Sequence, residues 1–554
     1  MLLTGAQIII KALIEQGVDV VFGYPGGYVI NIYDELYQNS DKITHYTTCH
    51  EQGACHAADG YARVTGRPGV VIATSGPGAT NLVTGIANAY LDSVPLVAIT
   101  GNVPTHMLGR DSFQEVDISG VTMPITKHNY LVKDVSRLAD TFREAFALAR
   151  SGRPGPVLID IPKDVQLGTA EYTPAAQQPA EKTECTPDTG VLEMAASLIA
   201  EAKRPYIYCG GGVVNANASR ELLEFADRID APIGLSIMGL TAVPYSHPRF
   251  LGMVGMHGRY GATKALYECD LLIAVGVRFS DRATGNKAEF MKNRKVIQID
   301  IDPAEINKNI GVNASIIGDI RHVLTALNKI LTETAHPEWM DRILYMKEHP
   351  DNNLEMDPGR LTPQSVIEGA CIKNCDNVVA TDVGQHQMWT TQYYQFKKPR
   401  TFVTSGGLGA MGFGMGSAIG ACIGNGFQRT LLFTSDGSFH MNMNELATAV
   451  SNKLPIVVIV LNNNALGMVR QWQTLFFEGR YSNTTPDRQT DYVRLAEAFG
   501  ARGFRAKTNA EYQRCLTEAF ECKCPALIEC VIDSNERVLP MIPAGGSIND
   551  IILR

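Results

Sequence analysis

Two short polar clusters in the last third of the chain have the residue types of a metal and phosphate site. Asp-Gly-Ser at 436–438 and Asn-Asn-Asn at 462–464 each follow an apolar, strand-like run. Open α/β sheets place their ligands at the carboxyl ends of strands, and Asp and Asn offer the hard oxygen ligands that Mg²⁺ prefers. Gly437 leaves room for a diphosphate at the backbone, and Ser438 can donate a hydrogen bond to it.

Taken alone, Asp-Gly-Ser is typical of a surface turn. Here an amphipathic, helix-like stretch follows it, and Asn463 comes 27 positions after Asp436. A strand, a helix and a second strand in this order would bring both clusters to one edge of a parallel sheet. The pair of clusters therefore favours a ligand site over an isolated turn.

A third candidate, Glu51, opens a predicted helix directly after an apolar and aromatic strand. The helix dipole stabilises an acidic residue at this position, and this alone would explain it. A carboxyl there could also take part in acid–base chemistry.

These candidates need elements to position them, and the chain predicts three α/β blocks. Strand-like and helical segments alternate within each block, which predicts parallel sheets covered by helices. We therefore expect three doubly wound parallel-sheet domains. In chain order, the predicted divisions are an N-terminal domain at 1–165, a linker at 166–189, a central domain at 190–332, a linker at 333–361, a third domain at 362–535 and a tail at 536–554.

Bulk composition narrows the classes of function. The 554 residues are 45% hydrophobic and carry a formal net charge of -8, which argues against a nucleic-acid surface. The N-terminus lacks a basic start and a cleavage site, and no apolar run approaches the roughly 18 residues of a membrane span. Twelve scattered cysteines suit reduced thiols. We expect a cytoplasmic protein without nucleic-acid or membrane partners.

Two other patterns point to ligands less strongly. Cys-His pairs at 49–50 and 55–56 are six residues apart, which does not place them on one helix face. The string GLGAMG at 407–412 fits the GxGxxG dinucleotide fingerprint, but the position about 20 residues further on holds no acid for a ribose. We expect neither zinc at the first pattern nor a dinucleotide at the second.

Asp-Gly-Ser, a helix and Asn-Asn at this spacing resemble the diphosphate–magnesium motif of thiamine-diphosphate enzymes. Strings along essentially the whole chain resemble one family among them, the catalytic subunits of acetohydroxyacid synthase. The matching strings are HEQG at 50–53, TSGPGATN at 74–81, LDSVPLVAITG at 91–101, FQE at 113–115, ITKHNYLV at 125–132, SGRPGPVLIDIPKD at 151–164, GMHG at 255–258, GVRFSDR at 276–282, DVGQHQMW at 382–389, GLGAMGFG at 407–414, LGMVRQWQ at 466–473 and VLPMIPAGG at 538–546.

The resemblance implies a pyrimidine-binding domain, a central flavin-binding domain and a diphosphate-binding domain. It also implies active sites between two subunits, where Glu51 of one chain hydrogen-bonds the aminopyrimidine ring of the cofactor held by the other. The implied metal ligands are Asp436, Asn463 and the carbonyl of Ala465. The implied thiamine diphosphate site comprises Pro25, Gly26, Gln385, His386, Gly409, Ala410, Met411, Gly437, Ser438, Asn463, Leu466, Gly467 and Met468.

The resemblance also implies a structural FAD and a substrate channel. The implied FAD site comprises Arg153, Gly211, Gly212, Ser236, Gly255, Met256, His257, Gly276, Arg278, Asp300, Ile301 and Asp319. In the channel, Arg282 would bind the acceptor carboxylate and Trp472 its alkyl end, while Phe113, Gln114 and Lys163 would line the access route.

The implied enzyme is a transferase that uses thiamine diphosphate, Mg²⁺ and FAD. It would decarboxylate pyruvate and condense the hydroxyethyl unit with pyruvate or 2-oxobutyrate, the first common step of valine, leucine and isoleucine biosynthesis. It would act as a homodimer or tetramer, with or without a small regulatory subunit. The alternatives are a flavin-independent catabolic acetolactate synthase and another thiamine-diphosphate 2-keto-acid decarboxylase or carboligase. A non-catalytic scaffold would be expected to lack Glu51 or Asp436, and both are present.

Two positions depart from the family pattern. Tyr28 stands where a small residue is usual, so its ring would narrow the substrate channel. Ser280 replaces a common Asp, which leaves Asp281 to pair with Arg282.

Overall fold

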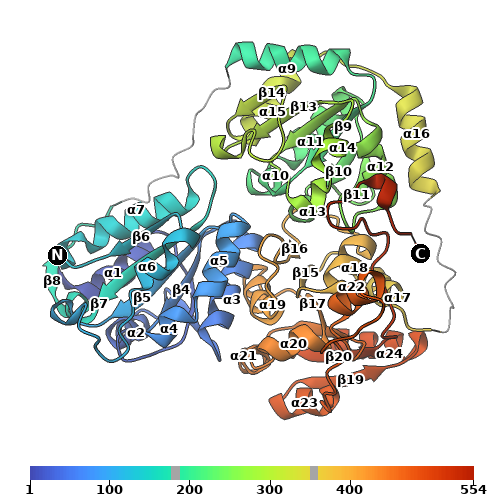
Figure 1. The fold of residues 1–554 in the computed structure, drawn as a ribbon. Helices are drawn as coiled ribbons and strands as arrows, with labels where there is room; N and C mark the ends of the chain where they lie inside the picture. The colour runs from blue at the N-terminus through green and yellow to red at the C-terminus, as the bar shows by residue number, and fades with distance from the viewer. Residues whose placement is uncertain (176–187, 350–359, 554) are drawn as a thin grey trace.

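The computed structural model describes residues 1–175, 188–349 and 360–553. It contains three successive α/β domains, each built on a six-stranded parallel sheet with helices on its faces (Figure 1). The predicted fold class is therefore confirmed. A two-stranded antiparallel pair, β1 (Leu2–Thr4) with β8 (Thr169–Glu171), joins the two ends of the N-terminal domain.

The first and third sheets share one topology. Their strand orders are β3-β2-β4-β5-β7-β6 and β16-β15-β17-β18-β20-β19, so in each sheet the first strand lies between the second and the third. The strands of the first sheet are β2 (Val20–Gly23), β3 (Thr44–Thr47), β4 (Gly69–Ala73), β5 (Leu96–Asn102), β6 (His128–Leu131) and β7 (Pro156–Pro162). Those of the third are β15 (Val378–Thr381), β16 (Phe402–Val403), β17 (Thr430–Ser435), β18 (Ile456–Asn462), β19 (Arg502–Ala506) and β20 (Ala526–Val531).

The central sheet has a different order, β11-β10-β9-β12-β13-β14. Numbered within the domain, this is the 3-2-1-4-5-6 order of dinucleotide-binding folds, whose ligands bind where the strand order reverses. The reversal falls between β9 and β12. The strands are β9 (Pro205–Cys209), β10 (Ile233–Leu235), β11 (Phe250–Met253), β12 (Leu271–Val275), β13 (Lys295–Asp300) and β14 (Ala314–Ile317).

The most extensive contact between the N-terminal and third domains is a pair of helices, α3 (Glu51–Thr65) and α19 (Phe413–Gly424) (Figure 1). Glycines let the two backbones approach. A Cβ at Gly420 would overlap the Ala57 carbonyl oxygen, and one at Gly60 would overlap the Ser417 carbonyl oxygen. One hydrophobic core runs across this contact, so the two domains share buried apolar surface.

Parts of the two predicted linkers have regular structure. β8 lies within 166–189, and helix α16 (Pro337–Glu348) lies within 333–361. The segments 176–187 and 350–359 are outside the described residues, and the domain limits stay predictions.

Two further features bear on the sequence-based expectations. Among the described helices, none is long and apolar enough to cross a membrane. Cys371 and Cys375, one turn apart at the end of α17 (Pro363–Lys373), form a disulfide, which differs from the expectation of reduced thiols. The other described cysteines are free.

Candidate active site

The two predicted metal ligands of the third domain meet at the carboxyl ends of neighbouring strands. β17 pairs in parallel with β18, so Asp436 and Asn463 follow paired strands. Burial raises the pKa of Asp436 to about 6, and backbone N–H groups, that of Asn463 among them, oppose the rise. The Asp436 Oδ1 atom is buried and has no hydrogen-bond partner among the described residues. A buried carboxylate oxygen without a partner fits a cation, because burying such a charge unpaired is costly.

The residues after Asp436 differ in one respect from the expected tight turn. Asp436 itself begins helix α20 (Asp436–Asn442), because Ser435 caps it: the Ser435 Oγ atom accepts the N–H of Ser438 at 3.4 Å. The Ser438 hydroxyl donates to the Val383 carbonyl at 2.7 Å. The single helix expected after 438 is two helices, α20 and α21 (Glu445–Ser451).

The other predicted thiamine residues of this domain gather around the same edge. Asn463 Nδ2 donates to Gln385 Oε1 at 3.3 Å, and Gln385 begins helix α18 (Gln385–Tyr393). Burial lowers the pKa of His386 to about 3, so its ring is neutral at pH 7, and its Nε2 atom has no partner among the described residues. Leu466 and Gly467 cap and begin α22 (Gly467–Phe476).

The C-terminal end of the loop at 407–412 is held at this edge by the Asp382 carboxylate. Asp382 follows β15, and its Oδ1 atom accepts the N–H of Gly412 at 2.8 Å. Gly409 has φ of 70°, a conformation that glycine adopts without strain. The loop thus brings Ala410 and Met411 to the point between β15 and β17 where the strand order reverses, which is where such sheets bind ligands.

The predicted site residues of the N-terminal domain form a separate group. Glu51 begins α3, and Asn81 Nδ2 donates to its Oε2 atom at 2.9 Å. Pro25 and Gly26 follow β2, and a Cβ at Gly26 would lie 2.5 Å from Thr74.

The predicted channel residues lie on this domain too. The Tyr28 hydroxyl donates to the Phe113 carbonyl at 3.2 Å, and the Phe113 side chain is highly exposed. Lys163 Nζ lies 3.4 Å from the Gly27 carbonyl oxygen and 5.9 Å from the Tyr28 ring centre. Gln114 has φ of 62° and accepts a hydrogen bond from the Ser75 hydroxyl through its carbonyl.

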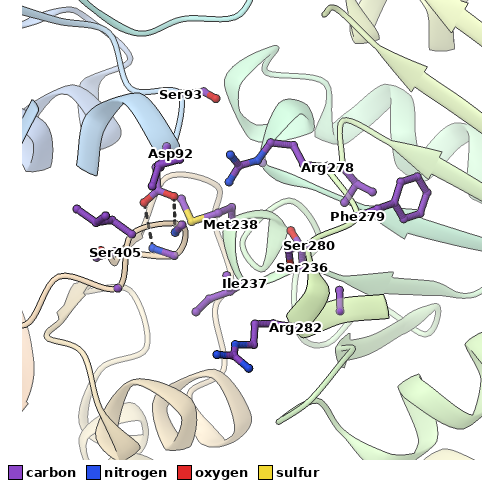
Figure 2. Close-up of a pocket in the computed structure, with 18 of the residues that line it drawn as sticks. Asp92, Ser93, Ser236, Ile237, Met238, Arg278, Phe279, Ser280, Arg282 and Ser405 are labelled. Atoms are coloured by element: carbon purple, nitrogen blue, oxygen red, sulfur yellow. Dashed lines mark hydrogen bonds between the residues drawn. The ribbon is translucent and has the colours of Figure 1, made fainter. Parts of the chain in front are cut away.

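A cavity of about 1720 Å³ lies where all three domains meet (Figure 2). Most of the residues predicted for FAD line it, together with both acceptor-binding candidates. The predicted residues that line it are Arg153, Gly211, Gly212, Ser236, Met256, His257, Gly276, Arg278, Asp300, Ile301, Asp319, Arg282, Gly409, Met468 and Trp472. Gly255 lines a small pocket beside it.

The central part of this cavity is the reversal point of the central sheet. Gly211 follows β9 and Gly276 follows β12, and a Cβ at Gly212 would lie 2.7 Å from the Cα atom of Gly276. Burial, followed by the charge of Arg153, lowers the pKa of Arg278. Two guanidinium groups that share a partly dry cavity fit an anionic ligand such as a diphosphate.

Burial shifts the pKa values of two further side chains that line the cavity, His257 and Asp300. Burial lowers the pKa of His257 to about 4 and raises that of Asp300 to about 6. His257 is therefore neutral at pH 7, and its Nδ1 atom has no hydrogen-bond partner among the described residues.

The rim next to the third domain carries the acceptor-binding candidates. The Arg282 side chain is mostly exposed and reaches into the cavity from α13 (Asp281–Thr284) (Figure 2). Its closest acid is Asp281 at 3.9 Å, as the sequence predicted. Trp472, on α22, packs with Met256, Leu539 and Met541, so the C-terminal tail supports it.

Some residues at the site were missed from the sequence. Asp92 accepts the N–H groups of Gly406 and Gly407 at 3.0 and 2.7 Å (Figure 2) and pairs with Arg63 at 2.9 Å. Glu305 is buried and pairs with Arg153 at 2.8 Å. An Asp inside LDSVPLVAITG is an unusual charge between apolar runs, and that was a usable signal. Glu305 had none.

Among the described residues, no three His, Cys, Asp or Glu side chains gather as a metal cluster. A site made of one Asp, one Asn and a carbonyl would not form such a cluster.

Comparison with known proteins identifies the class. Residues 3–121, 192–327 and 382–530 match, in order, the N-terminal TPP-binding, central and C-terminal TPP-binding domains of thiamine pyrophosphate enzymes. Thiamine pyrophosphate is the same cofactor as thiamine diphosphate. The fold and the site therefore define a thiamine-diphosphate enzyme.

Full-length relatives narrow the class further. A probable acetolactate synthase large subunit of Methanocaldococcus jannaschii is 45% identical over 99% of this chain and 95% of its own. The acetolactate synthase large subunit of Corynebacterium glutamicum is 46% identical over 99% and 90%, and isozyme 3 large subunit of Escherichia coli is 41% identical over 100% and 99%. The chain belongs to the acetolactate synthase (acetohydroxyacid synthase) large-subunit family, which confirms the resemblance seen in the sequence.

Proposed function

We propose that this chain catalyses the acetolactate synthase reaction: decarboxylation of pyruvate and transfer of the two-carbon unit to pyruvate or 2-oxobutyrate. This would be the first common step of valine, leucine and isoleucine biosynthesis. The observation that carries the proposal is the meeting of Asp436 and Asn463 at the carboxyl ends of β17 and β18, next to the reversal point of the third sheet between β15 and β17. Beside it lies a cavity lined by a cationic side chain, Arg282, and an aromatic side chain, Trp472.

In this proposal, Asp436, Asn463 and the Ala465 carbonyl hold Mg²⁺, and the buried, unpartnered Asp436 oxygen is one ligand. Bound thiamine diphosphate supplies a nucleophilic carbon and an electron sink for loss of CO₂. The chain holds the diphosphate at Gly437 and Ser438, keeps His386 neutral and excludes water from the reacting centre.

A second copy of the chain would complete the site. Glu51 and the exposed Phe113 are on the N-terminal domain, whereas the metal ligands and the cavity rim with Trp472 are on the third. We infer that Glu51 of one protomer hydrogen-bonds the aminopyrimidine bound by its partner, in a homodimer or tetramer. Sedimentation measurements with and without cofactors would give the oligomeric state.

The acceptor would be held by two contacts of different kinds. The Arg282 guanidinium can bind a carboxylate through two parallel hydrogen bonds. The Trp472 ring provides an apolar wall for the alkyl group. Because one methylene is worth about 1–3 kcal/mol in such a pocket, the choice between pyruvate and 2-oxobutyrate can be only moderate.

We further propose that the large cavity binds FAD. Its support is the 3-2-1-4-5-6 strand order of the central sheet and the pair Arg153 and Arg278 at the cavity wall. The flavin would be structural and take no part in electron transfer. If the purified protein is colourless and fully active without added FAD, the flavin-independent catabolic form of the enzyme is the better description.

A product assay tests the proposed reaction. Pyruvate should give acetolactate, detected as acetoin after acidification, and only when thiamine diphosphate and Mg²⁺ are present. Acetaldehyde as the main product would instead indicate a simple decarboxylase.

The Glu51→Gln variant tests the acid–base residue. Turnover should fall about 10²–10⁴-fold, the usual range for a positioned acid–base group. Glu193→Gln, an exposed change on α9 (Thr189–Glu201), is the matched control and should keep full activity. Near-normal acetolactate formation by Glu51→Gln would contradict the assigned role.

Two finer points are also proposals. The sequence left open whether a small regulatory subunit binds, and we propose that one does, because the relatives are named as large subunits. The location would be the cytoplasm. A pull-down from cell lysate with the tagged chain tests for the regulatory subunit. It should retain a protein of low mass, and adding that protein back to the purified chain should change the turnover.

A further inference from the structure

The two residues before Glu51, Cys49 and His50, are held by the other domain. They lie between β3 and α3 and follow Thr48, whose N–H still donates to the Gly23 carbonyl of β2 at 3.2 Å. The Cys49 N–H donates to Glu445 at 3.2 and 3.1 Å, to Oε1 and Oε2, and the His50 N–H donates to Oε1 at 3.0 Å. One carboxylate of the third domain thus binds two consecutive amides at the start of the Glu51 helix.

Burial and a hydrogen bond within the third domain hold the Glu445 carboxylate in place. Its residue is 0% exposed, and its Oε2 atom also accepts the Thr448 hydroxyl at 2.7 Å. An ionised carboxylate has only acceptor positions, which matches three donors. Burial raises the pKa of Glu445, and these hydrogen bonds oppose the rise. Burying a carboxylate without a salt bridge is costly, and the described residues give Glu445 no lysine or arginine partner within salt-bridge distance, so its stabilisation depends on these hydrogen bonds.

The first turn of α3 shows independently that this approach is tight. Gly53 is buried two positions after Glu51, and a Cβ there would overlap the Glu445 carboxylate. The helix start therefore fits against the carboxylate only because position 53 is glycine. Among the described residues, the Glu51 side chain accepts one hydrogen bond, from Asn81.

We propose that Glu445 is a positioning residue for Glu51: it fixes the Cys49 and His50 amides, and through them the start of α3 and the direction of the Glu51 carboxyl. The inference rests on the proposed function for its catalytic consequence. A misplacement of about 1 Å can cost about 10²-fold in rate, so an acid–base group at a helix start needs such a restraint.

The structural half of the proposal is tested without any cofactor. Hydrogen exchange followed by mass spectrometry on the apo full chain reports the amides of residues 49 and 50. Glu445→Ala should raise their exchange at least about 10-fold, since it removes both acceptors. Glu445→Gln keeps one oxygen for the amides and places its NH₂ group toward the Thr448 hydroxyl, so it should exchange nearly as slowly as the parent chain.

The functional half is tested on the holoprotein without pyruvate. Exchange of the thiazolium C2 proton into D₂O, measured by NMR after acid quench, reports how well Glu51 is placed. Glu445→Ala should slow it about 10- to 100-fold while thiamine diphosphate affinity changes less than about 3-fold. Glu445→Gln should restore most of the rate, and Gly53→Ala should behave like Glu445→Ala.

Controls separate positioning from general stability. Glu221→Ala removes another buried, paired carboxylate, on α11 (Ser219–Arg228) of the central domain. It should lower the melting temperature without slowing C2 exchange. If Glu445→Ala slows C2 exchange no more than Glu221→Ala does, Glu445 is structural and the inference is wrong.

Failure of the proposed function gives a different result. In that case the parent holoprotein would exchange C2 no faster than free thiamine diphosphate, and Glu51→Gln would change nothing. If the parent exchanges rapidly and Glu51→Gln slows it, but Glu445→Ala does not, only the inference on Glu445 fails.

Discussion

The molecule joins its domains in two contrasting ways. Where the N-terminal and third domains meet, α3 and α19 approach backbone to backbone through glycines, and a shared apolar core runs across the contact. Where the central domain meets both, a cavity of about 1720 Å³ remains, lined by arginines, aspartates and a desolvated histidine. The first contact is closely packed, and the second leaves an open cavity between the domains.

The contrast indicates where folding free energy and binding free energy reside. Close packing of apolar groups stabilises the folded state directly, because it removes surface from water and gains dispersion. Desolvated charges with few partners lower the stability of the folded state. A ligand of opposite charge that binds them offsets this free-energy cost. Substitutions at the closed contact should therefore change stability, and substitutions at the open cavity should change ligand affinity.

The largest expected effect is at the closest glycine. Gly420→Ala would drive its methyl group into the Ala57 carbonyl, and because neither backbone can move alone, we expect a loss of about 3 kcal/mol or more in the free energy of unfolding. Gly424→Ala, one turn on, meets the Thr65 side chain at 3.0 Å and gains helix propensity, so it should change stability by less than about 1 kcal/mol. Urea unfolding of both variants as apoprotein measures the difference. Equal losses would show that the contact is less tight than the backbone approach indicates.

The second-largest expected effect is at Asp92, which lies between the α3–α19 contact and the cavity. The Arg63 side chain, 7% exposed, lies between Asp59 and Asp92, and Asp92 also accepts the Gly406 and Gly407 N–H groups. Asp92→Ala should cost about 3 kcal/mol, at the lower end for a broken buried pair because Asp59 remains.

Asp376→Ala is the matched control for Asp92→Ala. Asp376 forms an exposed pair with Lys398 at 3.7 Å, and its loss should cost at most about 1 kcal/mol in the same unfolding experiment. A loss for Asp92→Ala no larger than this control would contradict the role of the buried network.

The fold was predictable because its signals are local. Buried parallel strands read as continuous apolar runs, as at Gly69–Ala73 and Ile456–Asn462, and the helices between them carry the usual periodicity. The turn expected at 436–438 became the first turn of α20 because Ser435 caps it, and a short polar cluster does not distinguish a turn from a capped helix start.

The site was predictable only where residue type and sheet topology suffice. Asp436 and Asn463 could be paired because strands in one parallel sheet end at the same edge. The bonds of Glu445 to residues 49–50 join positions about 395 apart in sequence, and no local pattern reports such contacts. Gly420 looked like an ordinary helix glycine, because its constraint is a backbone atom of another domain.

The third effect should separate binding from stability. Arg278→Ala removes a desolvated guanidinium from the open cavity, so the apoprotein should keep its stability within about 1 kcal/mol. Flavin affinity should fall about 10- to 100-fold, because hydrogen bonds to charged groups are worth about 1.5–3 kcal/mol. Fluorescence titration with FAD measures the affinity. Arg282→Ala, at the cavity rim, should retain flavin, and loss of flavin in both variants would argue against Arg278 as the specific contact.

The smallest effect concerns selectivity alone. Trp472 is supported by Met256 and the C-terminal tail and presents one apolar wall to the cavity, so Trp472→Leu should leave folding and flavin binding unchanged. It should lower the preference for 2-oxobutyrate over pyruvate by about 1 kcal/mol, roughly 5-fold, because one methylene loses part of its contact. Competition between the two acceptors, read as a product ratio, measures this. Phe476→Leu removes the neighbouring ring, 5.4 Å from Trp472, and should leave the ratio unchanged, since it does not line the cavity. If the two variants shift the ratio equally, the open cavity selects its acceptor through general packing of α22 and not through contact with Trp472.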